Sequence, residues 1–147
     1  MIVTKSWLCE WIDIRDISTA DLLLKLNSIG LEVESSRVYE VPKKIVFGKV
    51  IECEKHPDAS KLSVCQVDIG SSVRQIVCGA SNVRVGLLVA VATLGAVMPS
   101  GLVIKPVVLR GVESDGMLCS ASEIGIDQFS DGILEIDASI GTFKLGD

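Results

Sequence analysis

Aromatic side chains are scarce in this sequence, at 4% of 147 residues. Proteins that bind single-stranded nucleic acid without sequence preference stack bases on aromatic platforms, so the scarcity counts against that class. Neither a G-x-G-x-x-G nor a Walker A pattern occurs, which argues against a glycine-rich phosphate loop. His56 is the only histidine, and no serine has a nucleophile-elbow setting. The sequence therefore predicts no catalytic residue.

Long apolar runs are missing as well. The longest uncharged apolar stretch, residues 85–98, has 14 residues, whereas a membrane-spanning helix needs about 20. Residues 1–5 lack the apolar region and the cleavage site of a signal peptide. The five cysteines are odd in number and not tightly spaced, which indicates reduced thiols. We expect a soluble, cytoplasmic protein with no membrane partner.

Close pairs of metal-ligating residues are almost absent. Cys53-x-x-His56 is the only tight Cys/His pair, and a structural zinc site needs four ligands, usually from two such pairs. Cys65, Cys78 and Cys119 stand alone in apparent strands, where cysteine behaves as a small buried hydrophobe. We therefore predict no metal site and no cofactor in this chain.

What the chain does contain is a series of short runs rich in Val, Ile and Leu, separated by Gly, Asn and Pro. Five strands are predicted, at residues 45–54, 62–69, 73–78, 87–94 and 103–109. Gly48 is expected to mark a bulge or bend in the first strand. Five strands in so short a span are the count of an oligonucleotide/oligosaccharide-binding (OB) barrel.

The segments on either side of the barrel carry helix signals. The spacing of Trp7, Leu8 and Trp11 predicts a short amphipathic turn that packs both indoles in a core. Ser18 begins a capping box ahead of a leucine-rich run, and Gly30 suits the position that ends a helix. Apolar and acidic residues alternate strictly in Leu31-Glu32-Val33-Glu34, which favours a strand running toward residue 38.

Two further elements are expected after the barrel. A capping-box pattern at residues 120–123 predicts a short helix, and residues 132–137 are a plausible strand. Residues 1–42 and 126–147 are predicted to form a partial α+β first domain. The fold class is then mainly β, with a five-stranded OB-fold barrel at residues 43–125 inserted in that truncated small domain.

Charge is unevenly distributed along the chain. The net charge is −5, yet residues 43–112 hold nine cations and four acids, and no acid occurs between Ile69 and Val112. Two interpretations stay open. The cations are either solvated on separate barrel faces, or they form a basic surface that attracts phosphates.

The candidate contacts to a nucleic acid are mostly donors to phosphate and 2′-hydroxyl oxygens. Several surround the end of the first predicted strand and the turn after it. Met117 could pack on a base face, although a core position is the simpler interpretation. The full candidate set is Lys49, Lys55, His56, Lys61, Asn82, Arg110, Ser114, Met117 and Ser120.

Two runs carry a resemblance to a known family. Residues 56–70, HPDASKLSVCQVDIG, and residues 109–120, LRGVESDGMLCS, with QIVCGASNV at 75–83 between them, resemble the tRNA-binding OB-fold domain found in and around aminoacyl-tRNA synthetases. SWLCEW at 6–11 and LNSIGLEVE at 26–34 narrow the resemblance to the start of the bacterial phenylalanine–tRNA ligase β-subunit family.

The resemblance implies a non-catalytic tRNA-binding module, with the barrel inserted in a small first domain. It also implies that the chain is a fragment of a longer subunit, which forms a heterotetramer with α subunits. The α active site uses ATP and Mg²⁺, and no catalytic residue of the family maps onto this chain. The alternative is a structural or assembly module of the synthetase with little direct tRNA contact.

Overall fold

The computed structural model describes residues 1–147, which divide into two compact units, residues 1–38 and 39–147. None of its helices combines the length and the apolar character that crossing a membrane requires.

The first unit contains two helices, α1 (Lys5–Cys9) and α2 (Thr19–Ser28). Ser18 Oγ accepts a hydrogen bond from the backbone N–H of Asp21 at 3.1 Å, so the predicted cap is confirmed. Gly30 follows α2 with φ +85°, a left-handed conformation that glycine adopts without steric cost. Helical spacing and terminal residues thus fixed both ends of α2 correctly.

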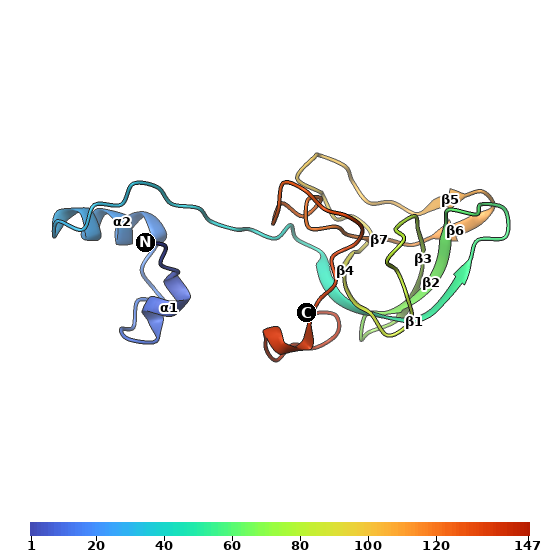
Figure 1. Cartoon of the computed structure of the whole chain (residues 1–147), viewed down its shortest axis with the longest axis horizontal. Helices are drawn as coiled ribbons and strands as arrows, with labels where there is room; N and C mark the ends of the chain where they lie inside the picture. The colour runs from blue at the N-terminus through green and yellow to red at the C-terminus, as the bar shows by residue number, and fades with distance from the viewer. The chain divides into compact units, whose positions relative to one another are not determined.

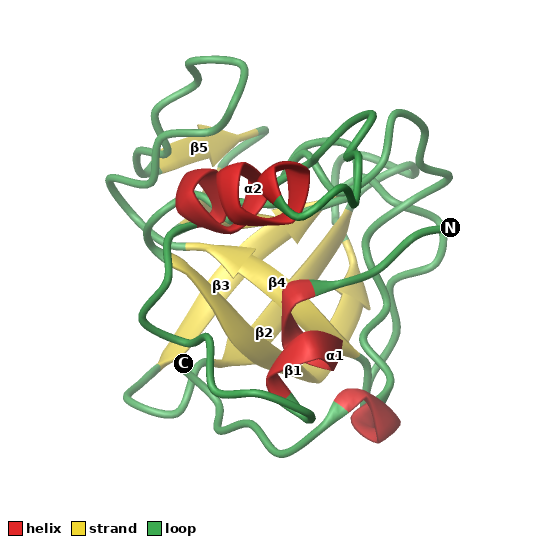
Figure 2. Ribbon diagram, turned by 90° about the vertical axis from the view of Figure 1, so that its left-hand side faces the viewer, coloured by secondary structure: helices red, strands yellow, loops and turns green.

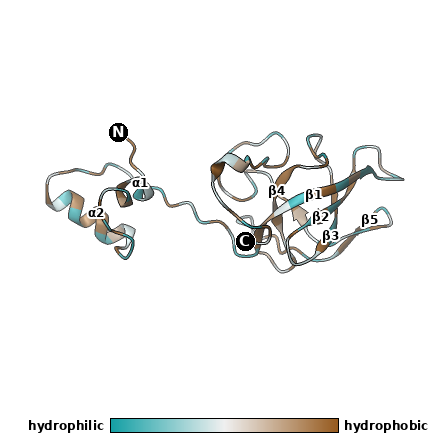
Figure 3. Cartoon of the chain, turned by 90° about the horizontal axis from the view of Figure 1, so that it is seen from below, coloured by the Kyte–Doolittle hydropathy of each residue, from teal (hydrophilic) through white to brown (hydrophobic).

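The apolar side chains of this unit remain largely exposed. Trp7 is 48% exposed and Trp11 79% exposed, so the prediction that both indoles pack in a core is wrong for this structure. Ile14 is the only buried residue among residues 1–38. Residues 31–38 form no strand, because no other strand pairs with them. Hydrophobic and hydrophilic residues share α2, as its mixed colouring shows (Figure 3).

The second unit is built on an antiparallel sheet that curves into a nearly closed barrel (Figures 1 and 2). The five-stranded sheet has the order β3-β2-β1-β4-β7, and a separate hairpin pairs β5 with β6. The strands are β1 (Ile45–Lys55), β2 (Ser63–Asp68), β3 (Val73–Cys78), β4 (Leu88–Ala92), β5 (Val107–Leu109), β6 (Val112–Ser114) and β7 (Met117–Leu118). A short 3₁₀ helix, η1 (Ala138–Ile140), follows them. The predicted five-stranded OB-type barrel is confirmed.

The long strand β1 is shared between two neighbours. Its first half pairs with β4 and its second half with β2, with the register shift of a bulge between Val50 and Glu52. The bulge therefore lies after Gly48 rather than at it. Gly48 is needed for a different reason, since a Cβ there would lie 2.6 Å from Val91 Cγ2 and 2.9 Å from Val67 Cγ1. The chain must be small where three strands crowd together.

The barrel closes through side chains as well as strands. Gln75 Nε2 on β3 donates to Glu113 O at 2.8 Å, and the backbone N–H of Asp115 donates to Gln75 O at 2.8 Å. These bonds hold the end of β6 beside β3, where Figure 1 also places the two strands. Together with β7 they bring the last strands back toward β3.

The core has two parts because β4 is buried on both faces. Val89 and Val91 point into the barrel interior, where they join the largest cluster with residues such as Val50, Val67 and Ile76. The alternate positions Ala90 and Ala92 belong to a second cluster on the other face, which also contains Ala96, Met98, Ile104, Cys119 and Ile124. Alternation along a strand sends successive side chains to opposite faces, so one strand serves both clusters.

Several predicted elements are shorter than expected. Only residues 107–109 of the predicted strand 103–109 are a strand, and β7 takes the fifth place in the sheet. The capping box forms, with Ser120 N donating to Glu123 Oε2 at 2.7 Å, but it closes a turn and no helix follows. Residues 132–137 supply one isolated bridge, Val89 to Glu135, instead of a strand.

Residues after 125 pack along the barrel. Leu134 N donates to Cys119 O at 2.9 Å and Ile136 N donates to Leu88 O at 2.9 Å. Phe143 stacks on Phe47 of β1 with ring centroids 4.4 Å apart. The assignment of residues 126–147 to one small domain with residues 1–42 stays a prediction.

Candidate nucleic-acid interface

His56 fastens the end of β1 to two loops. Its backbone N–H donates to Leu62 O at 2.9 Å, and its Nε2 lies 2.8 Å from Leu109 O. Its Nδ1 accepts from the backbone N–H of Asp58 at 3.0 Å, so Nε2 carries the proton and donates to Leu109. The ring is only 4% exposed, and both nitrogens are occupied. In this structure His56 positions loops and has no donor left for RNA.

Three exposed cations surround this fastening. Lys55 precedes His56, Lys61 precedes Leu62 and Arg110 follows Leu109, so the hydrogen bonds of His56 bring their backbones together. Arg110 has φ +49° and Gly111 φ +85°, as the tight turn between β5 and β6 requires. We call Lys55, Lys61 and Arg110 the cation triad.

Acidic residues lie near the cation triad as well. Glu54 on β1 and Asp58 in the following turn are both exposed at the same end of the barrel. Their carboxylates weaken the attraction for phosphate. The triad is therefore a local concentration of donors and not a strongly positive surface.

The nine cations of residues 43–112 do not form one surface. Lys49 stands on β1 directly across from Asp68 of β2, and Arg84 forms an ion pair with Glu135 at 2.8 Å. Lys43 and Lys105 are exposed, outside both the triad and any ion pair. Some cations are thus grouped and others are solvated or paired, and the attraction of the grouped cations for phosphate stays a prediction.

Ser114 and Asn82 serve the fold. Ser114 is 2% exposed, and its hydroxyl accepts from Val77 N at 3.0 Å and donates to Gly116 O at 3.2 Å. Both ends of the Asn82 amide bond the backbone of Ile133, at 2.9 Å and 3.0 Å. Both residues were predicted to donate to RNA, but these internal bonds occupy their polar atoms.

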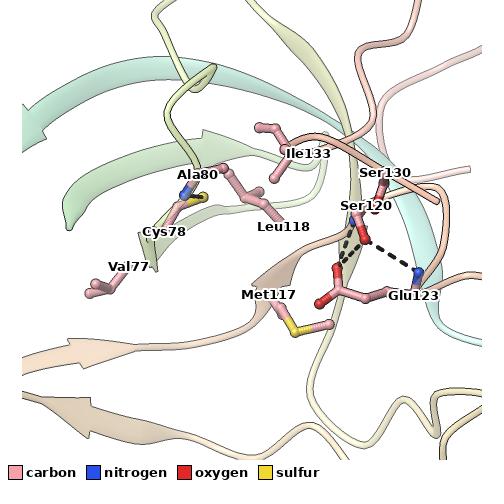
Figure 4. Close-up of a pocket in the computed structure, with 11 residues that line it drawn as sticks. Val77, Cys78, Ala80, Met117, Leu118, Ser120, Glu123, Ser130 and Ile133 are labelled. Atoms are coloured by element: carbon pink, nitrogen blue, oxygen red, sulfur yellow. Dashed lines mark hydrogen bonds between the residues drawn. The ribbon is translucent and has the colours of Figure 1, made fainter. Parts of the chain in front are cut away.

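Met117 and Ser120 line a common hollow of about 350 Å³ at the edge of β3 and β7 (Figure 4). Met117 also packs against the second core cluster, which agrees with its interpretation as a core residue. Ser120 Oγ donates to Glu123 Oε2 at 2.8 Å, and the dashed lines in Figure 4 mark this capping box. The carboxylate of Glu123 gives this hollow a negative side chain, which disfavours a phosphate there.

A second hollow of about 350 Å³ lies at the other end of β1. Its charged lining residues are Lys44 and Arg74, and Ser71 and Thr93 add hydroxyl groups. Neither Lys44 nor Arg74 is among the residues that the sequence predicts to bind a ligand. No local pattern reveals this hollow, because Lys44 and Arg74 are brought together only by the pairing of β1 with β2 and of β2 with β3.

The cysteines are free thiols in the structure, as expected. Burial raises the pKa of Cys65 and of Cys119 to about 12, which keeps both protonated and poorly nucleophilic. Cys53 and Cys65 lie opposite each other on β1 and β2 with sulfur atoms 3.7 Å apart. No group of three or more His, Cys, Asp or Glu side chains is arranged to hold a metal ion.

Comparison with known proteins extends these observations. The family described as "Putative tRNA binding domain" matches residues 45–142, which include the whole barrel. The phenylalanine–tRNA ligase β subunit of Sulfurimonas denitrificans is 69% identical over 147 residues, 100% of this chain and 19% of that protein. The β subunit of Campylobacter jejuni strain RM1221 is 52% identical over 146 residues, 99% of this chain and 19% of that protein. The chain therefore spans about a fifth of the length of these relatives.

A solved structure supports the fold alone. A MetRS-related protein from Pyrococcus horikoshii superposes with a TM-score of 0.51 over 76% of this chain and 96% of that one, at 21% sequence identity. Its similarity agrees with the barrel architecture described above.

Proposed function

Because the chain belongs to the tRNA-binding domain family, we propose that its barrel is a non-catalytic module that binds tRNA as part of a phenylalanine–tRNA ligase β subunit. The observation that carries the proposal is the match of that family to residues 45–142, together with the whole-length similarity to β subunits. The OB-type barrel supports it, since this architecture presents loops that bind nucleic acids.

The binding surface that we propose is the end of the barrel around His56. The cation triad donates to phosphate oxygens, while His56 holds the two loops that carry the triad in place. Lys49 adds charge from the middle of β1, six residues before Lys55, and Met117 and Ser120 provide a further contact, not to a phosphate, at the hollow beside β7. Contacts of this kind recognise the shape of folded RNA through its backbone and 2′-hydroxyls rather than a base sequence.

The full subunit supports attachment of phenylalanine to tRNA. In this proposal the β subunit acts in the cytoplasm within a heterotetramer with α subunits, and the assembled enzyme uses ATP and Mg²⁺. The present chain contributes no catalytic residue and holds no cofactor. Residues 1–42 and 126–147 form part of the small domain into which the barrel is inserted.

A second role, in assembly, is favoured by the exposed apolar side chains of the first unit. Trp11, Leu24, Ile29 and Leu31 are each more than half exposed, and large apolar side chains left exposed in such number are typical of an interaction surface. Since the relatives are about five times longer, we propose that the rest of the β subunit covers these side chains. Deleting residues 1–147 from the full subunit would then spoil assembly; normal assembly with weakened tRNA affinity would reject this role.

The experiment for the tRNA-binding proposal is a titration of fluorescent tRNA with the chain at low salt. The matched variants are Lys55→Gln/Lys61→Gln/Arg110→Gln, which removes the cation triad, and Lys105→Gln, an exposed lysine outside it. We expect the triple variant to bind at least about tenfold more weakly, and the control to bind like the parent. Absence of tRNA binding by the parent chain would contradict the proposal. If the triple variant bound tRNA as tightly as the parent, the binding surface would lie elsewhere on the barrel.

A further inference from the structure

The second hollow combines two cations with no carboxylate. Lys44 and Arg74 are its only charged lining residues, and Ser71 and Thr93 bring hydroxyl groups to the same space. The remaining lining residues are Val46, Ile69, Leu94 and Gly146. A hollow with this lining has donors and positive charge but no acceptor side chain of opposite sign.

The donors of this hollow have few partners within the chain. Arg74 forms no ion pair, and the only hydrogen bond of Lys44 Nζ goes to Leu94 O at a long 3.5 Å, with the ammonium lying beside Gly95. Ser71 Oγ makes no hydrogen bond to the protein, and it is exposed. Two like charges beside one hollow repel each other, and a bound anion converts that repulsion into attraction to both.

Two carboxylates close in sequence to lining residues are engaged elsewhere. Asp68 Oδ1 accepts the backbone N–H of Gly70 at 2.8 Å, and Asp147 Oδ2 accepts the backbone N–H of Lys144 at 3.1 Å. Neither residue lines the hollow. The positive charge there is thus not cancelled by a side chain of the barrel.

The backbone fixes the positions from which the side chains of Lys44 and Arg74 extend. Lys44 has φ +67°, and its carbonyl oxygen accepts two bonds from Thr93, one from the backbone N–H and one from Oγ1, both at 3.0 Å. Arg74 lies within β3, in register with Val67 of β2. A ligand therefore needs to order only the ends of the two side chains, which reduces the entropic cost of binding.

This hollow is separate from the cation triad. It lies where β1 begins, whereas Lys55 ends β1 eleven residues along the strand. At about 3.3 Å per residue, the two ends of an extended strand of that length are roughly 30 Å apart. A ligand group in the hollow is therefore not the one that the triad contacts.

We propose that the hollow lined by Lys44, Arg74 and Ser71 is a binding site for a phosphate group. The planar guanidinium of Arg74 offers two parallel donors to phosphate oxygens, and Lys44 adds a point charge. The phosphate comes either from an RNA backbone or from a small phosphate compound. Only the first of these sources rests on the proposed function.

The test uses inorganic pyrophosphate as the probe and the whole chain labelled with ¹⁵N. We expect its amide signals at residues 71, 74 and 94 to shift in a saturable manner. In Lys44→Gln/Arg74→Gln the affinity should fall at least about tenfold, whereas Lys105→Gln should bind like the parent. Circular dichroism and thermal melting of each variant check that the barrel is folded.

A parallel tRNA titration distinguishes the two sources. If the site takes an RNA phosphate, the double variant binds tRNA with a salt dependence shallower by about 2 in slope, and pyrophosphate competes with tRNA. If it takes a small phosphate compound, pyrophosphate still shifts these amides while tRNA affinity is unchanged. Either result supports the site, and the second does so even if the chain binds no tRNA. Pyrophosphate shifts that are absent, or that persist in the double variant, overturn it.

Discussion

At the scale of single residues, His56 holds the loop after β1 against the turn between β5 and β6 through its hydrogen bonds. The sequence identified its turn correctly, because proline at the next position favours an extended residue before it. Its partner Leu109 lies 53 positions away, and no local pattern signals that hydrogen bond. His56 was therefore predicted to contact RNA, whereas in the structure it is buried between loops that carry exposed cations.

Replacing His56 with alanine should lower the free energy of unfolding by about 1–3 kcal/mol, because Leu109 O and Asp58 N–H each lose a partner. Urea unfolding followed by circular dichroism measures the change. The control is Asp58→Asn, which keeps the backbone N–H and should stay within about 0.5 kcal/mol of the parent. An unchanged unfolding midpoint in His56→Ala would mean that the ring does not hold these loops together.

At the scale of elements, the first four strands were predicted correctly from the sequence. Long runs of β-branched residues with turn residues at each end predicted β1 to β4 within a few positions. The strands β5, β6 and β7 have two or three residues each, too few for any periodicity. Pairing with distant segments alone determines where these short strands form.

The substitution Gly48→Ala tests the crowding of β1 between β2 and β4. The new methyl group would lie 2.6 Å from Val91 Cγ2, inside the fully buried core, so we expect a loss of about 1–3 kcal/mol in stability. Gly79→Ala is the matched control, since a Cβ there meets only Leu62 Cδ2 at 3.4 Å. Thermal unfolding of both variants gives the comparison, and equal melting temperatures would refute the proposed crowding.

The segment after the barrel is held by a polar clasp that local sequence did not reveal. Arg84 and Asn82 donate to the carboxylate of Glu135, and they hold its pKa at about 2, well below its ordinary value of 4.5. The carboxylate is thus favoured in the folded state. The clasp is solvent-exposed, so its contribution to stability is modest and screened by salt.

The pH dependence of this clasp follows from the sign of the shift. Because the folded-state pKa of Glu135 is depressed, its contribution is fully present above about pH 4.5 and is lost as the pH falls toward about 2. We expect Glu135→Gln to be less stable than the parent at pH 7 and nearly equal to it at pH 2.5. Urea midpoints at both pH values measure this, and a difference that does not shrink on acidification would contradict the assigned cause.

At the scale of the whole molecule, the distribution of charge along the sequence does not predict which charges lie together on the surface. The sequence indicated a basic middle segment in an acidic chain. The structure resolves it into the cation triad, the Lys44 and Arg74 hollow, and cations that are paired or solvated singly. Which cations share a surface depends on strand order and register, and the sequence specifies these only through non-local pairing.

The most direct test of the central claim is the salt dependence of tRNA binding by the chain. Phosphate contacts release counterions, so the logarithm of the binding constant should fall linearly with the logarithm of salt concentration. The variant Lys49→Ala/Lys61→Ala should bind more weakly at low salt, with a slope shallower by about 2. Two results would contradict the claim that these cations of the barrel bind the RNA backbone. One is tRNA binding that is insensitive to salt, and the other is a slope that does not change when both lysines are replaced.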